Sequence, residues 1–214
     1  MQKLAMLVML SAFVAPPAWA SNVGIFGGLV VLDQLYMLGL PGKYYVAGDL
    51  GTVSYSHAIG SDGTSSFPNP RIFRIAGGYH ADRMTNDSVS IAGEWSYSMF
   101  SDSIIDYGTQ GQDTLRVGSW QAAFVLAYPL NPRFDLTGKI GFINNKVKSS
   151  TTVASMTGVN GSNNNLLFGV GAQYHLNMHY IVRAQLESFG KLEREGSQAE
   201  AAAYPFSVGL VYEF

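Results

Sequence analysis

Residues 204–214 read YPFSVGLVYEF, a short stretch with a regular pattern that ends on an aromatic residue. Every second side chain in it is large and apolar: Phe206, Val208, Leu210, Tyr212 and Phe214. The positions between them are mostly small or polar, with Ser207 and Glu213 as examples. A period of two is typical of a β-strand whose two faces meet different surroundings. The stretch is therefore predicted to be a strand with one apolar face.

The same period recurs along the chain in stretches of about ten residues. In 70–81, for example, Phe73 and Ile75 alternate with Arg74 and Ala76. The pattern predicts eight strands, near residues 43–56, 70–81, 88–100, 114–128, 133–147, 164–176, 179–191 and 204–214.

The connections between these segments sort by length. Long connections, polar or rich in small residues, occur at 58–69, 101–113, 149–163 and 192–203, and shorter ones at 81–87, 129–132 and 176–178. A transmembrane β-barrel has short periplasmic turns, longer external loops and an even number of strands. A soluble β-sandwich would also alternate, but its turns need not sort in this way. The prediction is an all-β fold, an eight-stranded antiparallel up-and-down transmembrane β-barrel.

A barrel in lipid explains why the alternation continues to Phe214. The final strand must close against the first, because an unpaired backbone group in lipid costs several kcal/mol. Its outward face then meets lipid, and an aromatic residue at the strand end fits the interfacial girdle of such barrels.

Residues 1–20, MQKLAMLVMLSAFVAPPAWA, resemble an export signal. Lys3 precedes an apolar stretch, and Ala18 and Ala20 form an A-x-A cleavage site. An uncleaved anchor is the alternative, but the apolar stretch is shorter than the roughly 20 residues that a span needs. The predicted organisation is a signal peptide (1–20), an N-terminal extension (21–42) and a barrel (43–214), located in the outer membrane of a Gram-negative bacterium.

Composition excludes several classes of function. The chain has no cysteine, which excludes disulfides, thiol chemistry and thiolate metal sites. Charged residues make up 13% of the chain, about half the usual share for a soluble domain. The formal net charge of −2 gives no basic footprint for nucleic acid.

Three stretches carry a family resemblance: KYYVAGDLG (43–51), PLNPRFDLTGKIGF (129–142) and LLFGVGAQYHLNMHYIVRAQLESFG (166–190). Together they resemble the OmpA-like, opacity-type family of eight-stranded outer-membrane barrels. The resemblance implies that LVYEF, with Tyr212 and Phe214, is a signal for the outer-membrane assembly machinery, and that periplasmic chaperones escort the chain. Residues 21–42 are longer and more apolar than expected before a first strand. An extra strand, a helix at the barrel mouth and a periplasmic segment all remain open for them.

The interior of an eight-stranded barrel is just wide enough for side chains to fill. The strand register predicts inward-facing charged residues at Asp49, Arg74, Glu94, Lys139, Arg183 and Glu187, and inward polar residues at Gln121, Gln173, His80 and His175. Because isolated buried charges are costly, the six charges are predicted to form a lumenal network. The network either plugs the barrel or acts as a gate whose pairs switch partners. A bulge would turn part of this list to the other face.

Residues that suggest metal or nucleotide chemistry have simpler explanations. His175 and His179 lie four apart, but they span a predicted tight turn and not a helix, so no metal site is expected. GVGAQY (169–174) lacks the third glycine and the following helix of a dinucleotide fingerprint. No cofactor is predicted.

Some small outer-membrane barrels are lipid-modifying enzymes, which place a serine and a histidine, or an aspartate and a histidine, near the outer rim. His57 lies beside Ser54 and Ser56, and Asp102 and Asp106 are in the next long connection. Serines and a histidine adjacent in one strand do not meet the geometry in which a base reaches the nucleophile and is oriented by an acid. No catalytic residue is predicted.

The predicted function is a surface-exposed structural or interaction role, with loops on a rigid barrel and a mostly plugged lumen. The alternative is a narrow channel for ions or small solutes, hydrophobic ones included. The expected partners are outer-membrane lipid and lipopolysaccharide, an extracellular ligand at the loops, and no nucleic acid, with the protein a monomer. Residues 149–165, rich in Ser, Thr, Asn and Gly, are expected to form a mobile, solvated loop.

Overall fold

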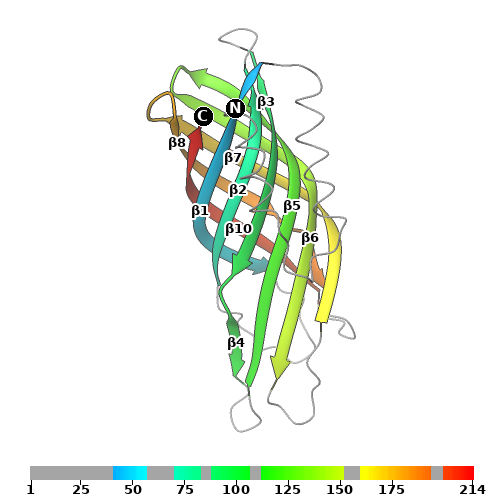
Figure 1. Cartoon of the computed structure of the whole chain (residues 1–214). Helices are drawn as coiled ribbons and strands as arrows, with labels where there is room; N and C mark the ends of the chain where they lie inside the picture. Colours follow the sequence, from blue (N-terminus) through cyan, green and yellow to red (C-terminus); the bar gives the residue numbers. More distant parts are fainter. Residues whose placement is uncertain (1–40, 57–69, 83–87, 107–111, 152–159, 194–199) are drawn as a thin grey trace, which may run out of the picture.

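The computed structural model describes residues 41–56, 70–82, 88–106, 112–151, 160–193 and 200–214. They form strands β1 (Gly42–Ser56), β2 (Arg71–Ala81), β3 (Ser90–Phe100), β4 (Ser103–Asp106), β5 (Gln112–Asn131), β6 (Phe134–Thr151), β7 (Asn160–His175), β8 (Tyr180–Ser188), β9 (Lys191–Glu193) and β10 (Glu200–Glu213). All pairings are antiparallel, and β1 also pairs with β10, so the sheet closes into a barrel (Figure 1).

Two of these strands are continuations of their predecessors. β4 pairs with β5 as β3 does, and β9 pairs with β10 as β8 does. Between β8 and β9, the Phe189 N–H donates to the Ala203 carbonyl, and the Ala203 N–H donates to the Gly190 carbonyl. This is a β-bulge, and the positive φ of Gly190 (69°) suits glycine. When β4 is counted with β3 and β9 with β8, the barrel has eight antiparallel strands. This confirms the predicted fold.

The two ends of the barrel differ. At one end, β1 starts beside the end of β10, with Tyr45 opposite Glu213, and short turns join β5 to β6 and β7 to β8. We call this the terminal end. At the opposite, loop end, β4, β5 and β6 project furthest (Figure 1).

Strands β6 and β7 continue further at the loop end than the sequence predicted. The expected loop over 149–165 is wrong for 149–151 and 160–165, which are strand residues; the strand predicted near 164–176 already included the last two. The strands keep pairing beyond the predicted boundary, with Lys148 opposite Asn160. The prediction relied on alternating apolar residues. It missed these strand ends because both of their faces are polar.

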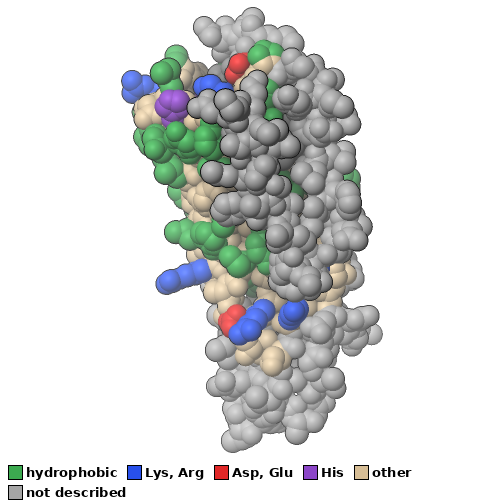
Figure 2. All heavy atoms as spheres, viewed as in Figure 1, with side chains coloured by type: hydrophobic (Ala, Val, Ile, Leu, Met, Phe, Trp, Pro, Cys, Tyr) green, Lys and Arg blue, Asp and Glu red, His purple; other side chains and the backbone are tan. Residues whose placement is uncertain are grey.

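The outward and inward faces of the barrel strands differ in polarity. Outward side chains are large and apolar, with Leu50 66%, Ile140 51% and Phe142 70% exposed. Inward side chains such as Gln121 and Ser207 are buried. Figure 2 shows apolar side chains gathered over the described surface. Among the described residues, no helix has the length and hydropathy needed to cross a membrane.

Two apolar layers fill the barrel interior. The loop-end apolar cluster consists of Val53, Ile72, Phe100, Val117, Ala123, Ile143, Val147, Leu167, Phe189 and Ala203. The terminal-end apolar cluster consists of Tyr45, Ala47, Ala76, Ala92, Val125, Ile181 and Val211. Asp49 lies between Ala47 and Val53 along β1, so a charged layer separates the two clusters.

Candidate functional site: the lumenal charge ring

Five strands supply the charged layer. Asp49 on β1 and Arg74 on β2 are direct cross-strand partners. Arg183 is on β8 and faces inward, and the same strand face also carries Glu187. Glu94 on β3 and Lys139 on β6 complete the set, and β5 separates their strands. Because side chains alternate along a strand, all six point into the lumen.

Asp49 binds both arginines of the layer. Its Oδ2 accepts a hydrogen bond of 2.9 Å from Arg74 Nε. Arg183 donates from Nε to Oδ1 at 2.8 Å and from Nη2 to Oδ2 at 2.7 Å. The second contact is a bidentate fork, a geometry that fixes orientation as well as charge.

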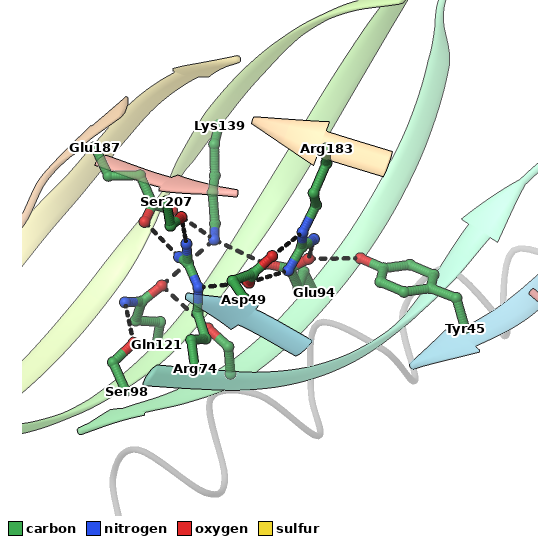
Figure 3. Close-up of polar contacts among 11 residues, drawn as sticks. Tyr45, Asp49, Arg74, Glu94, Ser98, Gln121, Lys139, Arg183, Glu187 and Ser207 are labelled. Carbon is green, nitrogen blue, oxygen red and sulfur yellow. Dashed lines mark hydrogen bonds and ion pairs between the residues drawn. The ribbon is translucent and has the colours of Figure 1, made fainter. Parts of the chain in front are cut away.

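The two glutamates extend these contacts into a closed circuit. Lys139 Nζ donates to Glu94 Oε1 at 2.7 Å and to Glu187 Oε1 at 2.8 Å. Arg183 Nη1 donates to Glu94 Oε2, and Arg74 Nη1 donates to Glu187 Oε2. The order around the circuit is Asp49, Arg74, Glu187, Lys139, Glu94, Arg183 and back to Asp49 (Figure 3). We call these six residues the charge ring.

Charges alternate around the ring, and every member contacts two members of opposite sign. All six side chains are buried, that of Lys139 being the most exposed at 3%. Desolvating a charge in a protein interior is strongly unfavourable unless partners and hydrogen bonds compensate. The ring supplies that compensation and is neutral as a whole. Each member therefore depends on two others, and losing one leaves two buried charges half-paired.

Neutral residues satisfy the remaining groups of the ring. Tyr45 donates its hydroxyl to Glu94 Oε2 at 3.1 Å, and Arg74 Nη2 donates to Ser207 Oγ at 2.6 Å. Gln121 accepts from Lys139 Nζ at 3.3 Å and is held by hydrogen bonds with Ser96 and Ser98. Sequence reasoning placed Gln121 inward but missed the tyrosine and the serines. Their strand parity was the available signal, since Tyr45 shares that of Asp49.

Gly209 makes room for the ring. A Cβ atom at this position would lie 1.9 Å from Asp49 Oδ1 and 2.5 Å from the Gly48 carbonyl oxygen. No side chain fits there without moving the carboxylate. This role was also missed, because glycine occurs in most strands of the chain and Gly209 has no distinguishing pattern.

The other predicted inward residues lie outside the ring, towards the terminal end. His80 Nδ1 is 3.1 Å from Glu213 Oε1, and His175 Nε2 is 2.8 Å from Asp135 Oδ2. Gln173 lines a cavity of about 20 Å³ beside Glu94 and Arg183. That volume is room for about one water molecule.

The residues that the sequence suggested for metal binding or catalysis make other contacts in the structure. His179 Nδ1 lies 3.0 Å from the Glu213 carbonyl oxygen, whereas His175 Nε2 contacts the Asp135 carboxylate. No group of three or more His, Cys, Asp or Glu that could hold a metal occurs in the part of the chain that the structure describes. Ser54 is an exposed strand residue.

Several candidate residues lie beyond description. His57 and the cleavage-site residues Ala18 and Ala20 are outside the described residues, as are the side chains of Ser56 and Asp106. Asp102 is described, and its carboxylate accepts three hydrogen bonds from Arg116.

The aromatic residues of the final strand form part of a cluster at the terminal end. The Tyr212 ring lies 5.1 Å from the Tyr180 ring and 5.1 Å from the Phe214 ring. The Phe214 N–H donates to the Tyr44 carbonyl at 2.9 Å, so the end of the chain is tied to β1. An outward aromatic group at this level is typical of an interfacial girdle.

Comparison with known proteins identifies a family and several similar folds. The family described as outer membrane protein beta-barrel domain matches residues 5–214. No curated protein matches the chain. The chain is similar to Ail, the attachment invasion locus protein of Yersinia pestis, in complex with the heparin analogue sucrose octasulfate: 16% identity, TM-score 0.55, 82% of this chain and 100% of that chain.

Two further solved structures are similar. Neisserial surface protein A has 14% identity and a TM-score of 0.54, covering 80% of this chain and 97% of that chain. AlkL, determined in lipid bilayers, has 13% identity and a TM-score of 0.51, covering 82% of this chain and 91% of that chain. At these identities the likeness supports the fold alone.

Proposed function

The chain belongs to the family of outer membrane protein β-barrel domains, and from this premise we propose that it is a surface-exposed structural or interaction protein with a plugged lumen. In this role the barrel anchors the chain in the bacterial outer membrane, and the external loops make the contacts. Loops carried by a rigid scaffold are where binding sites commonly occur. The extracellular ligand is defined by the loops, and the barrel acts as a monomer.

The proposal rests on two layers of side chains that are stacked along the barrel axis inside the lumen. The charge ring fills one level, and the loop-end apolar cluster, with Phe189 fully buried, fills the next. An ion would have to cross both. Switching partners within the ring leaves the apolar layer in place, and apolar constrictions exclude water and ions.

Export and assembly complete the proposal. Residues 1–20 are removed after Ala20 as a signal peptide, with Ala18 the other small residue of the site. Periplasmic chaperones deliver the rest, residues 43–214 form the barrel, and residues 21–42 form an N-terminal extension. Tyr212 and Phe214 form the signal for the assembly machinery. The terminal end then faces the periplasm, since short turns are periplasmic in such barrels.

We propose no catalytic activity, cofactor or metal. One contact supports the absence of catalytic activity. Asp102 is engaged by Arg116, with hydrogen bonds of 2.9 to 3.1 Å, so its carboxylate orients an arginine and not a histidine.

A narrow channel for ions or small solutes is the second candidate. It is favoured by the double partnership within the ring, because one contact can open while the other still compensates each charge. On this alternative the ring would be a gate, and the loop-end apolar cluster would have to move with it.

Conductance of the refolded mature protein in a planar bilayer decides between the two. Refolding is first verified by the change in gel mobility on heating. We expect silence from the wild type and from Lys139→Gln, which breaks the ring but leaves the apolar cluster. Lys43→Gln is the matched control, since Lys43 is at the terminal end and pairs with Glu213 at 3.6 Å. Steady conductance steps that change with Lys139→Gln and not with Lys43→Gln would contradict the plugged lumen and support a gated channel.

A further inference from the structure

Three cations gather on the outward face at the loop end. Arg116 on β5 lies opposite Lys148 on β6, and Gly118 lies opposite Lys146. The three share the strand parity of the lipid-facing residues Phe124 and Ile140, so they point away from the lumen. We call Arg116, Lys146 and Lys148 the basic cluster. Figure 2 shows Lys and Arg side chains near the end of the described surface where the apolar band stops.

The height of the basic cluster matches the edge of a membrane. Outward residues from Tyr128 to Gly118 span about 25 Å along the barrel axis, at roughly 3.4 Å per residue and a tilt of about 40°. That is about the height of the apolar band in such barrels. On β6, Phe142 is the last large apolar residue of this face, and Asn144 follows it. The cations begin where the lipid tails would end.

An aromatic platform lies below the cations, with Trp95 and Tyr97 half-buried and Trp120 buried between them. The Trp120 ring is 4.8 Å from the Trp95 ring and 4.3 Å from the Tyr97 ring. The Tyr97 hydroxyl lies over Gly118, 2.9 Å from where a Cβ would stand, and Gly118 faces Lys146. Aromatic rings of this kind settle at the level of lipid headgroups.

Asp102 orients the arginine of the cluster. Its carboxylate takes the Nε and Nη2 side of the guanidinium, and no contact with Nη1 is involved. The Arg116 side chain remains 70% exposed. Its outer edge, like the two lysines, is thus presented towards the surroundings of the barrel at headgroup height.

We infer that the basic cluster binds the phosphate groups of the outer-leaflet glycolipid, lipopolysaccharide. Lysine ammonium groups and an oriented guanidinium are suited to phosphate, and the aromatic platform suits the boundary between acyl chains and sugar. The cluster faces sideways into the leaflet, which favours a membrane lipid over a soluble anion. The inference rests on the proposed outer-membrane placement and names one partner within it.

The test uses the full mature protein refolded into phosphatidylcholine vesicles. Vesicles contain bisphosphorylated lipid A, the same lipid with its phosphates removed, or neither, and the midpoint of the heat-induced gel shift is measured. We expect phosphorylated lipid A to raise the midpoint and the dephosphorylated lipid to raise it much less. The double variant K146Q/K148Q should lose most of the rise.

Arg71→Gln is the matched control, because Arg71 is an exposed cation at the loop end of β2, which β3 separates from β5 and β6. It should keep the full rise. A full rise in the double variant, or equal effects of the two lipids, would overturn the inference. So would an equal rise from soluble sucrose octasulfate in plain vesicles that also needs the two lysines, since the site would then serve a soluble anion. A folded, non-conducting barrel with no lipid A effect would leave the proposed function intact.

Discussion

The charge ring and the loop-end apolar cluster are neighbouring layers of one lumen, yet they are held by different physics. In the ring, six charges from five strands each need two partners, so the layer is one interdependent unit. In the apolar cluster, side chains such as Ile143 and Leu167 contribute by contact alone. Substituting a ring residue should therefore also weaken the contacts of its neighbours, whereas substituting a cluster residue should have only a local effect on stability.

Breaking the ring at Arg183 should have the largest effect. Arg183→Met removes the fork to Asp49 and the contact to Glu94. Leaving buried charges under-compensated should lower the free energy of unfolding by about 3–5 kcal/mol. Urea unfolding in lipid vesicles, followed by tryptophan fluorescence, measures it. Arg116→Met, in an exposed ion pair, is the control and should change stability far less; equal losses would show that burial gives the ring no special weight.

The interdependence itself can be measured with a double-mutant cycle. Glu94→Ala and Lys139→Ala each break a ring contact, so the second substitution should cost less once the first is present. We expect the double variant to lose about 1–3 kcal/mol less than the sum of the two single losses. The same unfolding assay on all four proteins gives the coupling. Additive losses would mean that the two side chains act independently, as in the apolar cluster.

The space around the ring offers a smaller perturbation. Gly209→Ala places a methyl group against Asp49 Oδ1 and should cost about 1–3 kcal/mol, the range for overpacking a filled interior. Gly48→Ala is the matched control on the neighbouring strand, since its Cβ would meet nothing within 4 Å. Thermal gel-shift midpoints of the two variants are compared. Similar midpoints would show that Asp49 relaxes without loss.

The apolar cluster should give the smallest and most local effect. Ile143→Val removes one methylene from a buried side chain and should cost about 1 kcal/mol. Ile140→Val makes the same change on the lipid-facing side of β6, where lipid can fill the space, and should cost less. Unfolding in vesicles measures both. Equal costs would mean that the interior of the barrel is no better packed than its lipid contact.

The period of two was enough to predict most of the barrel. It separated lipid-facing residues such as Ile140 from inward ones such as Lys139, and it selected all six charges that the structure brings together. It was less informative at the loop end, where 160–163 fell outside every predicted strand. Those residues pair in β7 although their side chains are polar, and a pattern built on apolar residues does not detect such a strand.

Alternation along a strand shows whether a side chain points inward or outward. It does not show at which level along the barrel axis the side chain lies. The sequence alone therefore determined that Asp49, Arg74 and Glu94 enter the lumen, since alternation is a property of each strand by itself. The folded barrel adds three features: the charges close into a ring, Gly209 leaves space for Asp49, and Arg116 meets Lys148 at the membrane edge. These contacts depend on the stagger between strands, which accumulates through every pairing around the closed sheet.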